Sequence, residues 1–143
     1  LKIFVISLSF SYLIGEIFDI NMRLTLLINI IGLFLLIVFF VSFFICARIF
    51  FLHNEQLPPS TPTEKIIKRG IYSYTRNPIY ISFVGFQISM FLLFGNIIYL
   101  LSSLLLFLWI HFFVVLREET YLFNKFGQEY EKYKSTVPRW ILF

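Results

Sequence analysis

The stretch that decides the fold is Gly70-Ile71-Tyr72-Ser73-Tyr74-Thr75-Arg76-Asn77-Pro78-Ile79-Tyr80. It is polar and cationic, and long apolar runs lie on both sides of it. Pro78 can open a helix, because a residue at the first helical position has no N–H bond to lose. Asn77 is then the expected N-cap, and Arg76 lies beside the free N–H groups of the helix start. The stretch therefore predicts a helix that begins at Pro78 with an anion-binding site in front of it.

The composition predicts a membrane protein. Hydrophobic residues make up 59% of the 143 residues, aromatic residues 21% and charged residues only 14%. A bundle of membrane helices needs this much apolar surface, whereas a water-soluble domain of the same length does not. We therefore expect residues 1–143 to form a single, all-α integral membrane domain. The one cysteine, Cys46, permits no internal disulfide and no cysteine cluster, so no metal site is expected.

Four apolar spans are expected, each close to the ~20 residues that cross a bilayer. They run from about Ile3 to Phe18, from Leu24 to Phe51, from Pro78 to Phe94 and from Ile97 to Leu116. The first span is short, but it lacks a small-residue cleavage pattern and another span follows at once, which favours a retained helix over a signal peptide. Gly95-Asn96 permits only a tight hairpin, so the third and fourth spans should return to one surface.

The basic residues predict the orientation. Lysine and arginine gather on the cytoplasmic flanks of membrane spans. Most of them here lie between the second and third spans or after the fourth, and Arg23 stands alone on the opposite side. We therefore expect a multi-pass membrane protein with both termini, Pro78 and Glu118 at the cytoplasmic face. The linker His53–Arg69 contains three prolines and is predicted to be a loop over this face. Because the basic residues flank spans, no nucleic-acid partner is expected.

A second charged element, Arg117-Glu118-Glu119, closes the fourth apolar run. Carboxylates at a helix C-terminus oppose the helix dipole, so we expect this pair to face a positive partner. Apolar residues then recur at helical spacing from Leu122 to Val137, which predicts an amphipathic helix lying on the membrane or packed over the site. Val137-Pro138-Arg139-Trp140 ends this helix, and Trp140 is expected at the membrane interface.

Several elements in the C-terminal half carry a family resemblance. They are Gly70-x-Tyr72, Arg76-Asn77-Pro78-x-Tyr80, Glu118-Glu119-x-x-Leu122, Phe126-Gly127-x-x-Tyr130-x-x-Tyr133 and Val137-Pro138-Arg139-Trp140. In this order and spacing they resemble the isoprenylcysteine carboxyl methyltransferase family, and phospholipid N-methyltransferases share part of the pattern. Asn77 stands where the eukaryotic carboxyl methyltransferases have His, and Asn is common in the bacterial and phospholipid branches. Ser82 stands where a Gly is usual.

The resemblance implies a helical enzyme of a bacterial or archaeal cell membrane that uses S-adenosylmethionine. It also implies that these segments hold the cofactor near the cytoplasmic face. The cofactor-binding residues that it implies are Tyr72, Arg76, Asn77, Pro78, Ile79, Tyr80, Glu118 and Glu119. Two further residues are candidates for catalysis. His111 lies about two turns inside the fourth span, where an ionisable side chain is a functional candidate, although a structural histidine bonded to a neighbouring helix is equally consistent. Arg117 adjoins the carboxylate pair.

The chemistry of this cofactor matches the candidate residues. S-adenosylmethionine carries a carboxylate, an ammonium, a sulfonium and a flat adenine. Arg76 and the N–H groups at the helix start suit the carboxylate of the cofactor. Glu118 or Glu119 suits its ammonium or its ribose hydroxyls, and Tyr72 or Tyr80 suits its adenine. Neighbours on a helix point about 100° apart, so one carboxylate should matter more than the other. The resemblance favours Glu119 as the contact, with Glu118 oriented by Arg117 or Arg139, and the reverse assignment stays open.

The expected acceptor is a prenylated or lipid-like amphiphile whose head reaches the cytoplasmic interface. A carboxylate head is favoured, because it needs no general base and the motifs contain no dedicated base. Membrane lipids are the other expected partners. Two alternatives stay open. One is a phospholipid amine N-methyltransferase. The other is a non-catalytic membrane protein in which Arg76 only sets the topology and the two glutamates form a solvated surface network.

Overall fold

The computed structural model describes residues 1–18, 20–52 and 65–141, and these residues are helical with short connections. The elements are α1 (Lys2–Ile17), α2 (Leu26–Leu52), the 3-10 turn η1 (Gly70–Ser73), α3 (Pro78–Phe94), α4 (Ile97–Trp109), the π-helical segment η2 (Ile110–Val115), α5 (Leu116–Phe126) and α6 (Gln128–Thr136). Within these residues no β-strand occurs, and Asn21 and Asn96 form an isolated antiparallel bridge. The expected all-α architecture is confirmed.

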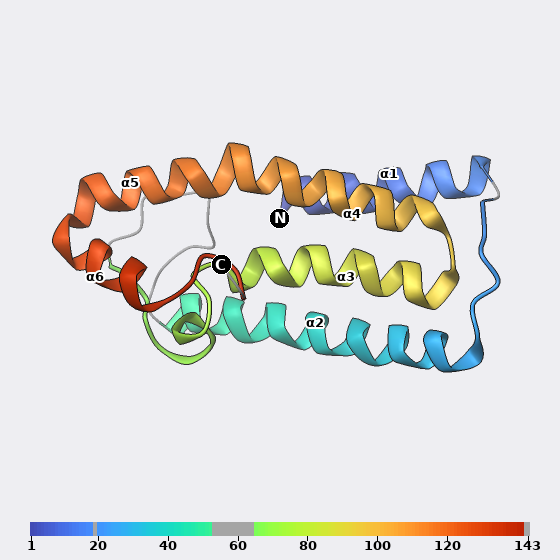
Figure 1. Ribbon diagram of the computed structural model, residues 1–143, viewed down its shortest axis with the longest axis horizontal. Coiled ribbons are helices and arrows are strands. Elements are labelled where there is room, and N and C mark those ends of the chain that lie inside the picture. Colours follow the sequence, from blue (N-terminus) through green and yellow to red (C-terminus); the bar gives the residue numbers. More distant parts are fainter. Residues whose placement is uncertain (19, 53–64, 142–143) are drawn as a thin grey trace.

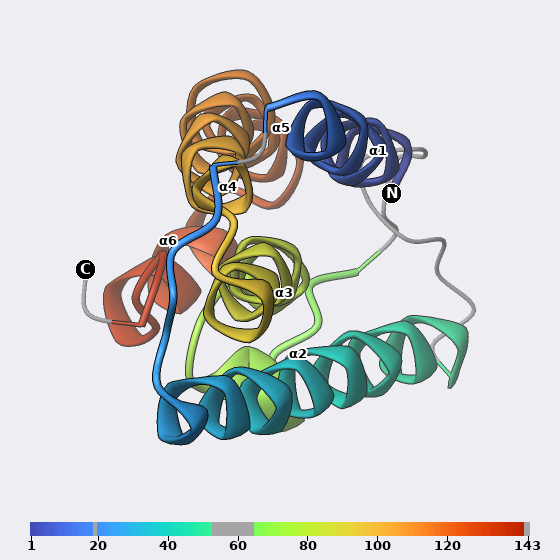
Figure 2. The same ribbon diagram turned by 90° about the vertical axis from the view of Figure 1, so that its right-hand side faces the viewer.

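The long helices run side by side, and α3 lies at the centre (Figures 1 and 2). Helix α2 packs against α3, α3 against α4, and α1 against α4. The first half of α1 also reaches α3, because the Phe4 and Phe83 rings stack at 4.6 Å. Gly85 allows α2 to approach closely, since a Cβ atom there would lie 2.4 Å from the Phe39 ring. The bundle therefore rests on apolar side chains and small residues.

In the part of the chain that the structure describes, two helices are long and apolar enough to cross a membrane, judged by length and composition. One is α2, and the other is the continuous helix Ile97–Phe126 formed by α4, η2 and α5. The remaining expected spans are shorter, since α1 has 16 residues and α3 has 17. Many large apolar side chains of α1 and α2 point outward, as on lipid-facing helices.

The hairpin between α3 and α4 forms as the sequence predicts. Gly95 ends α3 with a left-handed φ of 73°, and the Asn96 side chain accepts a hydrogen bond from the Ile98 N–H at 3.0 Å. A side chain at Gly95 would collide with the backbone, because a Cβ atom would lie 2.2 Å from the Met22 carbonyl oxygen. The start of α3 at Pro78 is also confirmed. As a result, both charged motifs lie at the end of the bundle opposite this turn (Figure 1).

Two predicted helix boundaries are wrong. The fourth apolar helix does not end at Leu116, because it continues through a π-helical segment into α5 and reaches Phe126. Glu118 and Glu119 therefore lie in the first turn of α5 and not at a helix C-terminus, so the dipole argument does not apply to them. The predicted amphipathic helix is also interrupted. Gly127 takes φ 52° and ψ −123°, which few other residues adopt, and it separates α5 from α6.

Helix α6 packs over the charged end of the bundle and does not lie apart on a membrane surface. Tyr130, Tyr133 and Val137 form a small buried cluster with Ile66, Leu122 and Phe126 at its edge. The Tyr133 hydroxyl donates to the Tyr72 carbonyl oxygen at 2.7 Å, which ties α6 to η1. Most of the predicted loop His53–Arg69 falls on residues 53–64, which lie outside the described residues.

Candidate functional site

The C-terminal segment is bound to the loop that precedes α3. The Arg76 N–H donates to the Pro138 carbonyl oxygen at 3.0 Å, and the Thr75 hydroxyl and the Asn77 side-chain amide both donate to the Arg139 carbonyl oxygen at 3.0 Å. Asn77 occupies the N-cap position of α3, but its side chain makes no capping bond. The expected N-cap position of Asn77 is therefore confirmed, although its side chain has another partner. Asn77 instead fixes the backbone of Arg139 beside Arg76.

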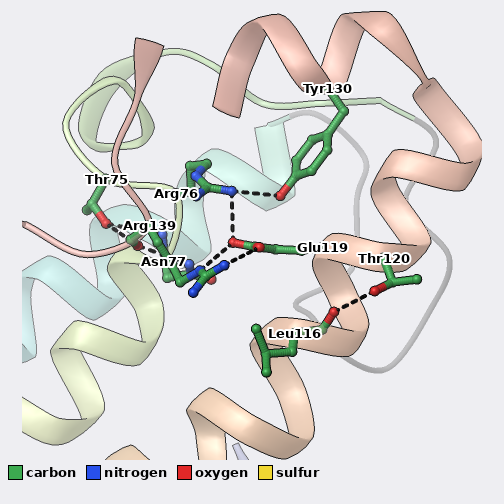
Figure 3. Close-up of polar contacts among 8 residues, drawn as sticks. All are labelled: Thr75, Arg76, Asn77, Leu116, Glu119, Thr120, Tyr130 and Arg139. Atoms are coloured by element: carbon green, nitrogen blue, oxygen red, sulfur yellow. Dashed lines mark hydrogen bonds and ion pairs between the residues drawn. The ribbon is translucent and has the colours of Figure 1, made fainter. Parts of the chain in front are cut away.

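Three charged side chains from different parts of the chain meet at this end of the bundle (Figure 3). The Arg76 Nη1 and Glu119 Oε1 atoms lie 2.8 Å apart. Arg139 contacts both oxygens of the same carboxylate at 2.8 Å, through Nε and Nη2. The side chains of Arg76 and Glu119 are only 8% and 13% exposed, so this ion cluster is largely shielded from water. Shielding strengthens the attraction and makes the loss of one partner costly.

The ion cluster carries one excess positive charge, because two guanidinium groups share one carboxylate. Arg76 Nη1 also donates to the Tyr130 hydroxyl at 3.0 Å. Burial raises the pKa of Tyr130, Glu119 raises it further and Arg76 partly offsets both, so Tyr130 remains a neutral phenol. The Arg76 Nε atom is buried and has no hydrogen-bond partner within the described residues. A buried guanidinium donor of this kind is free for a ligand oxygen.

Glu118 has a different environment from Glu119. Its Oε2 atom accepts a hydrogen bond from the Tyr80 hydroxyl of α3 at 3.0 Å. Within the described residues Glu118 has no ion pair, whereas Glu119 has two. The expectation that Arg139 orients Glu118 is therefore wrong, since Arg139 binds Glu119. The two neighbouring carboxylates thus have different partners, and which of them contacts a cofactor stays a prediction.

Four of the predicted cofactor-binding residues are buried in the core, namely Tyr72, Pro78, Ile79 and Tyr80. Pro78 is fully buried, and Ile79 and Tyr72 are 4% and 6% exposed. Ile79 and Tyr72 belong to the main apolar core, where the Tyr72 ring meets Phe50 edge to face at 5.7 Å. Their side chains stabilise the segment that carries Arg76. Any contact that they make with a ligand stays a prediction.

The two predicted catalytic residues do not join the ion cluster. Arg117 is exposed, and its guanidinium carbon lies 5.9 Å from the centre of the Phe113 ring, one turn earlier on the same helix. His111 lies in the π-helical segment, with its ring centre 6.0 Å from those of Phe107 and Trp140. Its Nδ1 atom is buried without a hydrogen-bond partner in the part of the chain that the structure describes. Single-turn π segments are frequent at functional sites, so His111 stays a candidate.

Three residues of this region are absent from the predicted site, namely Tyr130, Arg139 and Trp140. Tyr130 and Arg139 are bonded to the ion cluster, and the sequence contains both of them in the motifs Phe126-Gly127-x-x-Tyr130 and Val137-Pro138-Arg139-Trp140. From the sequence we expect Trp140 at the membrane interface, but its side chain does not point outward from the protein. It is 5% exposed and belongs to the apolar core, because the backbone bonds from Thr75 and Asn77 to Arg139 draw the C-terminal segment inward.

Comparison with known proteins identifies the family. The phospholipid methyltransferase family model matches residues 20–129, and the chain belongs to this family. A protein-S-isoprenylcysteine O-methyltransferase of Schizosaccharomyces pombe is 38% identical over 76 residues, which cover 51% of this chain and 31% of that protein. An uncharacterized protein of Haemophilus influenzae is 40% identical over 63 residues, which cover 44% of this chain and all of that protein. No solved structure matches the chain.

The family assignment confirms the resemblance drawn from the motifs and supports a membrane methyltransferase. The chain spans about a third of the length of the Schizosaccharomyces pombe protein, so that protein's activity is not transferred to this chain as a whole. The matched residues 20–129 include Arg76, Glu118 and Glu119, whereas Arg139 lies beyond them. In this chain the family region and the C-terminal segment together build the ion cluster.

Proposed function

We propose that this protein is an S-adenosylmethionine-dependent methyltransferase of the membrane, acting on the head of an isoprenoid- or lipid-like amphiphile. One observation carries the proposal. Arg76, just before α3, has a buried donor without a partner among the described residues, and Glu118, in the first turn of α5, has no ion pair among them. These two parts of the chain lie at one end of a bundle of apolar helices (Figure 1). Glu119 connects the two, because it binds Arg76 and is the chain neighbour of Glu118.

These residues fit the amino-acid end of S-adenosylmethionine. The Arg76 Nε atom has a hydrogen to donate and no partner among the described residues, which suits a carboxylate. Glu118 accepts one hydrogen bond from Tyr80 and has no ion pair among the described residues, which suits an ammonium. Glu119 is already neutralised by two guanidinium groups. We therefore assign the cofactor ammonium to Glu118 and give Glu119 the task of holding Arg76 and Arg139 in place.

When bound, S-adenosylmethionine supplies a methyl group activated by a sulfonium. The residues of this chain bind and orient the reactants and exclude water, which accounts for most of the catalysis in such a transfer. A carboxylate acceptor reacts without losing a proton. This favours O-methylation, with Arg117 on the exposed face of α5 as a candidate for attracting the acceptor.

An amine acceptor is the second candidate, and the description of the family as phospholipid methyltransferases supports it. An amine must be neutral to react, so the site would have to accept a proton. The Nδ1 atom of His111 has no partner among the described residues and is the group that would accept this proton. Methylated amine lipids in cells that express the protein would distinguish this candidate from the carboxylate methyltransferase.

Binding of S-adenosylmethionine to the protein in detergent, measured by calorimetry, tests the proposal. Glu118→Gln should weaken binding by about 10- to 150-fold, the equivalent of roughly 1.5–3 kcal/mol for a hydrogen bond to a charged group. Arg76→Ala should weaken it by a similar factor, and Arg76→Lys should recover part of the loss. Glu129→Gln is the matched control, because Glu129 pairs with Lys68 at the surface. A folded parent protein that does not bind S-adenosylmethionine would support the non-catalytic alternative.

A further inference from the structure

Two neighbouring aromatic side chains, those of Trp140 and His111, each carry a polar atom without a hydrogen-bond partner among the described residues. The Trp140 Nε1 and His111 Nδ1 atoms are both buried, and neither has a hydrogen-bond partner in the described part of the chain. Their ring centres lie 6.0 Å apart with the ring planes inclined at 36°. Phe107 is the third member of this aromatic group, with its ring centre 5.1 Å from that of Trp140.

Packing alone does not account for a tryptophan at this position. Its ring fills the core against Phe107, and a phenylalanine could fill much of the same space without burying an N–H group. A buried N–H without an acceptor costs free energy, because it loses its hydrogen bond to water and gains none in return. The same cost applies to the Nδ1 atom of His111. Two such atoms on neighbouring rings indicate a site for a polar group that is not part of the chain.

The position of this pair relates it to the ion cluster. Trp140 directly follows Arg139, whose carbonyl oxygen is held by Thr75 and Asn77 and whose side chain holds Glu119. The Trp140 backbone is therefore fixed at the charged end of the bundle. His111 belongs to the π-helical segment Ile110–Val115, two turns before Glu118 on the same continuous helix. Trp140 and His111 therefore lie where the charged end of the bundle meets its apolar helices.

We propose that Trp140 and His111 form a binding subsite for an oxygen atom of the acceptor head group. The Trp140 Nε1–H group donates a hydrogen bond to this oxygen, and His111 donates a second from Nδ1 in the tautomer that carries its proton there. The ligand class is an amphiphile with a carbonyl or carboxylate oxygen next to its apolar tail, and the proposal rests on the proposed function. The pair binds and orients the acceptor, whereas Arg76 and Glu118 bind the cofactor.

The substitution Trp140→Phe tests the subsite, because it removes the N–H group and retains an aromatic ring against Phe107. Trp109→Phe is the matched control, since Trp109 is 40% exposed and stacks on Phe113 at the surface of the same bundle. The probes are N-acetyl-S-farnesylcysteine in detergent micelles and vesicles of phosphatidylethanolamine. Three quantities are measured for each variant. The first is the affinity for S-adenosylmethionine. The second is the affinity for each probe, obtained from the rise of the unfolding temperature when the probe is added, and the third is the KM for any probe that is methylated.

The subsite predicts a selective effect. Trp140→Phe should weaken the affinity for the effective probe by about tenfold, as expected for the loss of one hydrogen bond, and leave the affinity for S-adenosylmethionine unchanged. Without a probe, Trp140→Phe should unfold at or above the temperature of the parent, since it removes an unpaired donor. Trp109→Phe should match the parent throughout.

Three results would overturn the inference. The first is a probe affinity in Trp140→Phe equal to that of the parent, and the second is an equal loss of cofactor and probe affinity. The third is a parent that binds S-adenosylmethionine but responds to neither probe. A parent that fails to bind S-adenosylmethionine would instead reject the proposed function, so the two failures are distinguishable.

Discussion

Removing the charge of Glu119 should destabilise the protein far more than the same change at a surface glutamate. Glu119 receives contacts of 2.8 Å from Arg76 Nη1, Arg139 Nε and Arg139 Nη2. Glu119→Gln keeps the shape of the side chain but leaves two guanidinium groups next to each other without a counter-charge. The side chain of Arg76 is 8% exposed, so water cannot replace the lost partner.

The structure sets the expected size of this effect. Removing one partner of a buried ion pair costs about 3–5 kcal/mol, and the amide oxygen of Gln can still accept a hydrogen bond, so we expect about 3 kcal/mol. Glu129→Gln is the matched control. Glu129 lies 2.7 Å from Lys68, but the two side chains are 59% and 38% exposed. A pair of this kind contributes about 0–1 kcal/mol.

The single cysteine provides the assay. Cys46 is free and fully buried, so a thiol-reactive fluorogenic probe reports its exposure as the protein unfolds in detergent. The unfolding temperature of Glu119→Gln should fall well below those of the parent and of Glu129→Gln. Adding Arg76→Gln should recover part of the loss, because it removes the most buried unpaired charge. Equal unfolding temperatures for Glu119→Gln and Glu129→Gln would refute the structural role of the ion cluster.

Three further predictions concern the topology and the helix contacts. Cysteines placed at Lys65 and Gln128 in a Cys46→Ala protein should be labelled from the cytoplasmic side and not from the outside, and labelling of either from the outside would reject the orientation. Gly95→Ala should lower the unfolding temperature more than Gly127→Ala, because both positions have a positive φ but only Gly95 faces backbone atoms, at 2.2 Å. Gly32→Ala should be destabilising because its Cβ atom would lie 2.6 Å from the Leu93 backbone nitrogen, and equal stability to the parent would contradict the packing of α2 on α3.

Local signals predicted much of the fold. Pro78 and Gly95-Asn96 bound α3 at the predicted residues, because a proline helix start and a glycine turn act through their own backbone. The end of the fourth span could not be predicted in the same way. Its apolar run stops at Leu116, but the helical backbone continues past the charged residues to Phe126. Glu118 and Glu119 bind residues from other parts of the chain, and these contacts stabilise the helix beyond Leu116. A hydropathy pattern contains no information about such contacts.

The candidate site was predicted in part for a related reason. Arg76, Glu118 and Glu119 belong to motifs that are compact in sequence, and the hairpin brings them together as expected. The partner of Glu119 could not be assigned from the sequence, because Arg117, beside Glu118, and Arg139, in the C-terminal segment, were both available to the carboxylate pair. Only the three-dimensional path of the C-terminal segment, held by Thr75 and Asn77, selects Arg139 for Glu119.

The different roles of Glu118 and Glu119 follow from their positions on helix α5. Adjacent residues point about 100° apart, so Glu118 faces Tyr80 on α3 while Glu119 faces the loop that carries Arg76 and the segment that carries Arg139. Glu119 forms ion pairs with two arginines of this chain and holds them beside each other. Glu118 has no ion pair among the described residues, so its carboxyl group remains available to a cation from outside the chain. Glu119 thus positions two cationic side chains, and Glu118 supplies a carboxyl group near them. A ligand with both a carboxylate and an ammonium requires both kinds of group.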